Sequence, residues 1–288
     1  MKKKLLLLLK IGISAVLLYL IFLKIPFGEV YTTLWRVHWG FLSLGAFFFV
    51  LSKLIAAYRL QLFWQSIEVF LGNVYHLKLY LLGMFYNLFL PGGIGGDAYK
   101  GYVIKKTFQS PTKKIFGVLL VDRLSGLLLL CVLSALLPVF GVHEMFSPFK
   151  YFLLAAIPLG IGVFYVAIKK IYPYTLRVFW KAFALSAGVQ MAQLTAAFFI
   201  LMALGTKGAL GAYLLVFLIS SIVAVIPMTI GGIGSRELTF LYGAQWLSLD
   251  YSNAIAMSLL FFFITAAVSL TGIRYHFGSL AAPGKYTK

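Results

Sequence analysis

Two glycine-rich stretches contain the residues whose types and spacing best suit chemistry. The first reads LPGGIGGD at 90–97, and the second reads IPMTIGGIGSRE at 226–237. Glycines permit tight turns and let backbone N–H groups approach a ligand closely. A helix that starts after such a turn directs its positive dipole end toward the same space, which favours a phosphate group. We therefore predict that the two glycine-rich stretches contribute to a phosphate-binding site.

An acidic residue and a cation accompany each glycine stretch. Asp97 follows the first stretch, and Lys100 lies three residues further on, where the two side chains can touch on one helix face. In the second stretch Arg236 stands directly before Glu237. An alternative is that Asp97 and Glu237, with Ser235, only cap the helices that begin there.

A charged pair, Asp122-Arg123, interrupts the apolar segment IFGVLLVDRLSGLLLL. A charge inside a membrane is costly, so it normally faces protein or water and has a partner. Neighbouring helix residues do not face the same way. We expect Arg123 to face a cavity and Asp122 to pair with a base or cap a loop. The alternative for Arg123 is a shallow position from which it snorkels to the inner interface.

Two further cations lie near the end of another apolar segment. Arg59, in AAYRL, is either a site residue or an anchor at the membrane interface. Lys53 lies deeper along the same segment, and its long side chain suits snorkelling.

The composition places these residues in a membrane protein. The chain has 288 residues, of which 62% are hydrophobic and 11% charged, and apolar runs recur throughout, which indicates one all-α polytopic membrane domain over 1–288. A net charge of +18 then marks cytoplasmic loops and contacts with anionic lipid rather than nucleic-acid binding. The single cysteine and four scattered histidines predict neither a metal site nor a cofactor.

The apolar runs predict six full spans and two broken segments. The broken segments, His76–Leu90 and Gly211–Ile226, are short and end at the glycine stretches, and a second amphipathic piece follows each, at Asp97–Ile104 and Ser235–Leu247. We interpret both as re-entrant helical hairpins. The six spans are Leu5–Leu23, Trp39–Tyr58, Ile115–Phe140, Tyr151–Ile168, Lys181–Leu204 and Asn253–Ile273.

The two glycine stretches indicate an internal repeat. Gly92-Gly93-Ile94-Gly95 recurs 139 residues later as Gly231-Gly232-Ile233-Gly234, which divides the chain into halves at about 1–145 and 146–288. With re-entrant hairpins and a cytoplasmic N-terminus, 18 of the 25 Lys and Arg residues lie inside and 4 outside. The C-terminus is then cytoplasmic too, and the halves are inverted repeats, as in many transporters.

Four segments together resemble the lysylphosphatidylglycerol synthase transmembrane region, or flippase-like domain: LPGGIGGDAYKGYVI at 90–104, VDRLSGL at 121–127, AAYRL at 56–60 and IPMTIGGIGSRE at 226–237. The resemblance implies a lipid translocase. Lys100 stands where the resemblance leads us to expect arginine, so bidentate phosphate binding is not expected there. The soluble synthase half is not expected in this chain. The implied site residues are Gly92, Gly93, Gly95, Gly96, Asp97, Lys100, Asp122, Arg123, Gly231, Gly232, Gly234 and Glu237.

The expected function is therefore that of a flippase or scramblase rather than an enzyme. It would move an aminoacylated or anionic phospholipid through a polar cavity between the halves, with Arg59 and Arg236 added to the binding residues. The alternative substrate is a polyprenyl phosphate or polyprenyl-linked sugar. An intramembrane lipid transferase has less support, because the sequence has no HExxH, Ser-His or Asp-rich motif. Expected partners in the cytoplasmic (inner) membrane are lipids, a separate lipid-modifying synthase and further copies of the chain.

Overall fold

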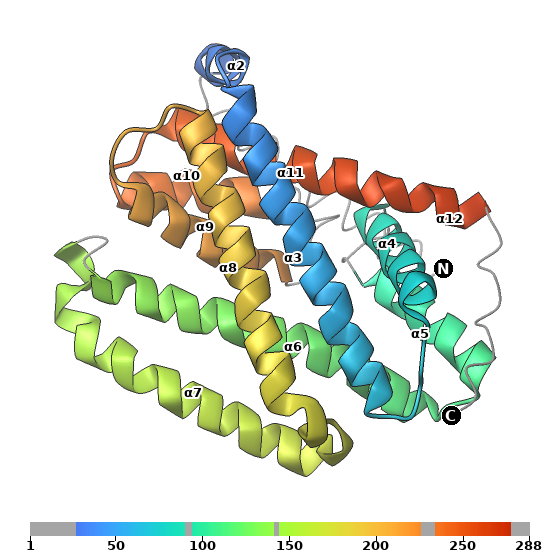
Figure 1. The fold of residues 1–288 in the computed structure, drawn as a ribbon. Helices are drawn as coiled ribbons and strands as arrows, with labels where there is room; N and C mark the ends of the chain where they lie inside the picture. The colour runs from blue at the N-terminus through green and yellow to red at the C-terminus, as the bar shows by residue number, and fades with distance from the viewer. Residues whose placement is uncertain (1–26, 90–93, 141–143, 226–233, 278–288) are drawn as a thin grey trace, which may run out of the picture.

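The computed structural model describes residues 27–89, 94–140, 144–225 and 234–277, and within these ranges every regular element is helical (Figure 1). The α-helices are α2 (Phe27–Trp35), α3 (Trp39–Gln65), α4 (Asn73–Phe89), α5 (Gly95–Phe108), α6 (Thr112–Leu136), α7 (Lys150–Ile171), α8 (Phe179–Ala203), α9 (Leu210–Val225), α10 (Ser235–Trp246), α11 (Tyr251–Leu270) and α12 (Arg274–Phe277). Short 3₁₀ helices are η2 (Leu137–Phe140), η3 (Glu144–Phe149), η4 (Pro173–Val178) and η5 (Thr271–Ile273).

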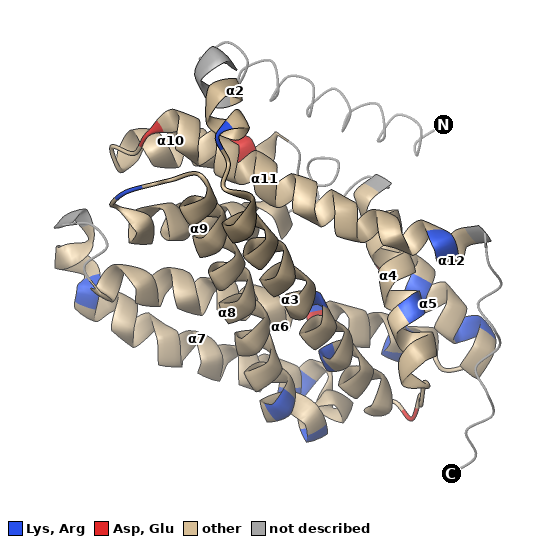
Figure 2. Cartoon of the chain, turned by 45° about the horizontal axis from the view of Figure 1, so that its top comes forward, with Lys and Arg blue, Asp and Glu red and all other residues tan. Residues whose placement is uncertain are grey.

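Five helical segments are long and apolar enough to cross a membrane, which identifies a multi-pass membrane protein. They coincide with five of the six predicted spans, and the remaining one, Leu5–Leu23, lies outside the described residues. Lys and Arg gather mainly near helix ends and connections (Figure 2). The five segments are Trp39–Gln65, Thr112–Phe140, Phe146–Ile171, Pro173–Ala203 and Tyr251–His276.

One predicted boundary is wrong. The span predicted at Trp39–Tyr58 continues as α3 to Gln65. The prediction ended the span before Arg59 because an arginine commonly marks the membrane interface. In the structure Arg59 is buried, and the helix continues past it.

Helices α3 and α8 form an antiparallel pair at the centre of the molecule (Figure 1). The backbone N–H of His38, at the start of α3, donates to the carbonyl of Ala203, at the end of α8, over 2.8 Å. Further along, a Cβ on Gly45 would lie 3.2 Å from the carbonyl of Ala196. The small residue therefore allows close contact between the two backbones.

The two broken segments form short helices that pack in pairs. Helix α4 contacts α5, and α9 contacts α10. A Cβ added to Gly96 would lie only 1.8 Å from the carbonyl oxygen of Gly83, so the contact between α5 and α4 requires glycine. Each pair also contacts a long helix from the other half of the sequence: α4 contacts α11, and α9 contacts α6.

Candidate functional site

Asp97 lies between two cations. It occupies the first turn of α5, and its Oδ1 is 2.6 Å from Nζ of Lys100 one turn further on. Its other oxygen, Oδ2, accepts a hydrogen bond from Nε of Arg123 on α6. The Asp97 and Lys100 side chains are 12% and 6% exposed, whereas that of Arg123 is 29% exposed. Arg123 is therefore the member of this cluster most open to a ligand.

The N-terminus of α5 is stabilised by α4 rather than by Asp97. The N–H of Gly96 donates to Oδ1 of Asn87 over 2.8 Å. Both Asp97 oxygens contact cationic side chains instead. The capping interpretation therefore does not describe the contacts of Asp97, and the predicted contact between Asp97 and Lys100 is present.

Glu237 behaves differently and does cap its helix. Its Oε2 accepts from the N–H of Gly234 over 2.7 Å, and its Oε1 accepts from the hydroxyl of Ser258 over 3.0 Å. Gly234 is the N-cap of α10 and has φ 87°, a conformation that favours glycine. Ser235 is the first residue of α10, so its predicted role as the cap is wrong.

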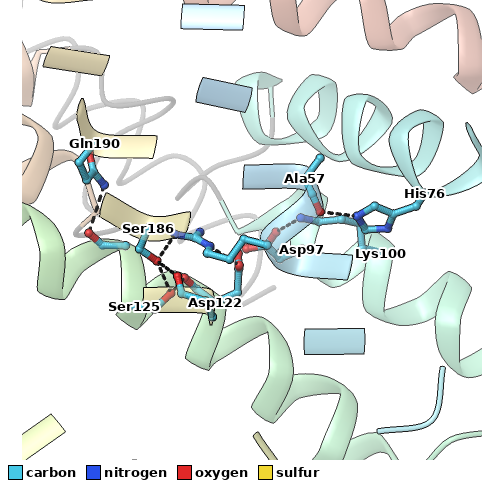
Figure 3. A network of polar contacts seen from close by, with 11 residues as sticks. Ala57, His76, Asp97, Lys100, Asp122, Ser125, Ser186 and Gln190 are labelled. Carbon is cyan, nitrogen blue, oxygen red and sulfur yellow. Dashed lines mark hydrogen bonds and ion pairs between the residues drawn. The ribbon is translucent and has the colours of Figure 1, made fainter. Parts of the chain in front are cut away.

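A second polar cluster joins α3, α6 and α8 (Figure 3). Nε of Arg59 is 2.8 Å from Oδ1 of Asp122, and its Nη1 donates to the hydroxyl of Ser186 over the same distance. Ser186 also lies 3.2 Å from the hydroxyl of Ser125. Since Arg59 is buried and paired, it is not an interface anchor. Asp122 pairs with a base, as predicted.

Two more contacts extend this polar region and were not predicted. Nε2 of Gln190, one helical turn after Ser186, donates to the carbonyl of Gly126 over 3.2 Å (Figure 3). At the other end, Nε2 of the buried His76 on α4 donates to the carbonyl of Ala57 over 2.7 Å. Ser186 and Gln190 are four residues apart in an apolar segment. This spacing places both on one face of a helix, and it could have indicated a polar contact inside the protein.

A hollow of about 180 Å³ opens beside Asp97 and Arg123. One side of it carries this ion pair. The rest of the lining is mainly apolar and comes from α5 and α6, and includes Ile94, Ala98, Phe116, Leu119 and Leu120. The hollow therefore presents both charged and apolar surfaces to a ligand.

The remaining predicted site residues are divided between described and undescribed parts of the chain. Gly95 is the first residue of α5, and Arg236 lies in the first turn of α10. The predicted residues Gly92, Gly93, Gly231 and Gly232 lie outside the described residues. Within the described ranges, no group of three or more His, Cys, Asp and Glu residues is placed to hold a metal ion.

Replacing Ser186 with alanine is expected to lower stability by about 1–3 kcal/mol, because the buried, charged guanidinium of Arg59 loses its hydrogen bond to the Ser186 hydroxyl. Thermal unfolding in detergent measures this. Ser43→Ala is the matched control, since the hydroxyls of Ser43 and Ser186 both contact the carbonyl four residues earlier in their helices, and Ser43 is exposed. Equal shifts in Tm for the two variants would contradict the role of Ser186.

Comparison with known proteins identifies one family. The family model described as the lysylphosphatidylglycerol synthase TM region matches residues 7–177 and 169–272. These ranges include both polar clusters and both glycine stretches. No curated protein matches the chain.

Proposed function

The chain belongs to the lysylphosphatidylglycerol synthase transmembrane-region family, and we propose that it moves a phospholipid between the leaflets of a membrane. The observation that carries this proposal is the hollow beside Asp97 and Arg123. A charged patch next to an apolar wall suits an amphiphile better than a fully polar solute. The substrate class is a phospholipid with an anionic or aminoacylated headgroup.

The ion pair can bind both charges of such a headgroup. The guanidinium of Arg123 is planar and always charged, so it can donate two hydrogen bonds to a phosphate. Asp97 can accept from the ammonium group of an aminoacylated headgroup. The ammonium group of Lys100 also contacts Asp97, at 2.6 Å. A lipid would thus replace part of the Asp97–Arg123 contact when its headgroup enters.

The packing of the helices supports two related halves. If the chain is divided at about residue 145, as predicted, the order of the elements makes α3 correspond to α8, α4–α5 to α9–α10, and α6 to α11. The first of these pairs is antiparallel, as an inverted repeat requires. The contact of α4 with α11 has its counterpart in the contact of α9 with α6. We propose that both short pairs are re-entrant hairpins that enter from opposite faces.

The proposal includes a position in the cytoplasmic membrane with both termini inside. A separate synthase would supply an aminoacylated lipid. The lipid tails would remain in the bilayer while the headgroup crosses, which avoids the cost of placing a charged headgroup in hydrocarbon. The role is that of a transporter, driven by a lipid or ion gradient.

Transbilayer lipid movement in proteoliposomes tests this function. Purified protein is reconstituted with a trace of fluorescent phosphatidylglycerol, and dithionite then quenches the outer leaflet. We expect quenching beyond the outer-leaflet fraction with protein and none beyond it in empty vesicles. Identical quenching in both would contradict the function. Movement of a labelled polyprenyl phosphate alone would instead favour the second predicted substrate.

A further inference from the structure

Within the part of the chain that the structure describes, two cations inside the protein form no ion pair with a carboxylate. The chain has seven acidic residues, and Glu29, Glu68, Glu144 and Asp250 belong to α2, to connections or to helix ends. The other three are Asp97, Asp122 and Glu237. Asp97 and Asp122 bind Lys100, Arg123 and Arg59. Glu237 caps α10 and contacts Ser258.

Two of the remaining partly buried cations are Lys53 on α3 and Arg236 on α10. Among the described residues, neither lies within ion-pair distance of a carboxylate. Both are partly buried. Because charges within a membrane protein normally have a partner or mark a ligand path, these two require an explanation.

Both cations lie on one aromatic cluster. Nζ of Lys53 is 4.6 Å from the ring centroid of Phe49, and Cζ of Arg236 is 4.8 Å from that of Phe261. The Phe49 and Phe261 rings pack edge to face with their centroids 5.4 Å apart. Phe217 completes the cluster, 4.7 Å from Phe261 and 5.9 Å from the Arg236 guanidinium.

The aromatic rings are weak partners for these charges. A ring face attracts a cation much less strongly than a carboxylate or phosphate does. The Arg236 guanidinium also contacts the hydroxyl of Ser221, at 3.5 Å. The two cations and the hydroxyl together provide donors for an oxyanion.

The internal repeat relates Arg236 to Asp97 of the first half. Arg236 lies 139 residues after Asp97, which is the same offset that relates the two glycine stretches. The second half therefore has a cation where the first half has an acid. On α3, Lys53 lies six positions before Arg59 of the second polar cluster, or roughly 9 Å along the helix axis.

We propose that Lys53 and Arg236 form a second anion-binding site, which receives the phosphate diester of a lipid headgroup. This proposal rests on the proposed function and assigns it a second binding position, separate from Arg123. Arg236 would donate to two phosphate oxygens, Lys53 would donate a further hydrogen bond to the same group, and the Phe49–Phe261 cluster would hold both side chains in place. The same chemistry could bind free phosphate.

Equilibrium binding to the purified full chain in neutral detergent tests this site. The probes are dioctanoyl phosphatidylglycerol, dioctanoyl phosphatidylcholine and inorganic phosphate. The variants are Lys53→Gln and Arg236→Gln, with Lys53→Arg as the conservative change. Lys78→Gln is the matched control, because Lys78 is also partly buried and lies over an aromatic ring, that of Tyr275, at 6.0 Å.

We expect each glutamine variant to raise the Kd for phosphatidylglycerol about tenfold or more, since a charge-assisted hydrogen bond is lost. Lys78→Gln should bind as the wild type does, and Lys53→Arg should retain most of the affinity, because it keeps the charge. Competition by millimolar inorganic phosphate, abolished in the same variants, would support the site with free phosphate as a ligand. Unchanged affinity in both folded glutamine variants would overturn the proposal. If Lys53→Gln fails to fold, Lys53→Met replaces it.

The binding result separates this inference from lipid movement. If wild-type protein binds phosphatidylglycerol through Lys53 and Arg236 but moves no lipid, the translocase function fails and the anion site stands. If it moves lipid and both glutamine variants bind normally, the function stands and the anion site fails.

Discussion

Replacing Arg123 with alanine is expected to slow transbilayer movement of phosphatidylglycerol at least about tenfold, because a charge-assisted contact with the headgroup phosphate is lost. Arg123 is the most exposed residue of its cluster, lines the hollow and contacts Asp97. Asp97→Ala should have a similar effect, since it leaves two cations without their shared acid. The dithionite assay in proteoliposomes measures both variants.

The control for Arg123 is Arg274→Ala, which removes an exposed arginine from α12. It should move lipid at the wild-type rate, and Arg123→Lys should retain part of the activity, since it keeps the charge but not the planar fork. Wild-type rates in folded Arg123→Ala and Asp97→Ala would refute the assignment of this hollow as the headgroup site.

Replacing Asp122 with leucine is expected to lower stability by about 3–5 kcal/mol, because Arg59 then lies buried without its ionic partner. The double variant Arg59→Leu/Asp122→Leu should recover most of this loss, since an apolar pair carries no uncompensated charge. Thermal unfolding in detergent, compared across the cycle of single and double variants, measures the effect. A double variant less stable than Asp122→Leu would contradict this explanation.

The helices follow closely from the sequence, because long apolar runs leave few alternatives in a membrane. Five predicted spans coincide with helical segments. The error at the end of α3 came from treating Arg59 as a boundary residue. Its partner Asp122 lies 63 positions away, and no local spacing indicates such a contact.

The candidate site was predictable only where its contacts are local. The contact between Asp97 and Lys100 follows from their spacing on one helix. The contact between Asp97 and Arg123 depends on how α5 packs against α6, which composition does not determine. Lys53 suited snorkelling by its length and position, yet its ammonium group lies over Phe49. The two acids after the glycine stretches have unlike contacts, although their sequence contexts are similar.

Cysteine labelling gives the most direct test that two hairpins enter from opposite faces and return. Single cysteines in a Cys131→Ser background would replace Val74, in the first turn of α4, and Thr112, shortly after α5. They would also replace Lys207, shortly before α9, and Gln245, in the last turn of α10. All four positions are exposed. With a membrane-impermeant maleimide, we predict labelling of 74 and 112 from the cytoplasmic side and of 207 and 245 from the other side. Labelling of either pair from two different sides would contradict the inverted hairpins and the transport path between them.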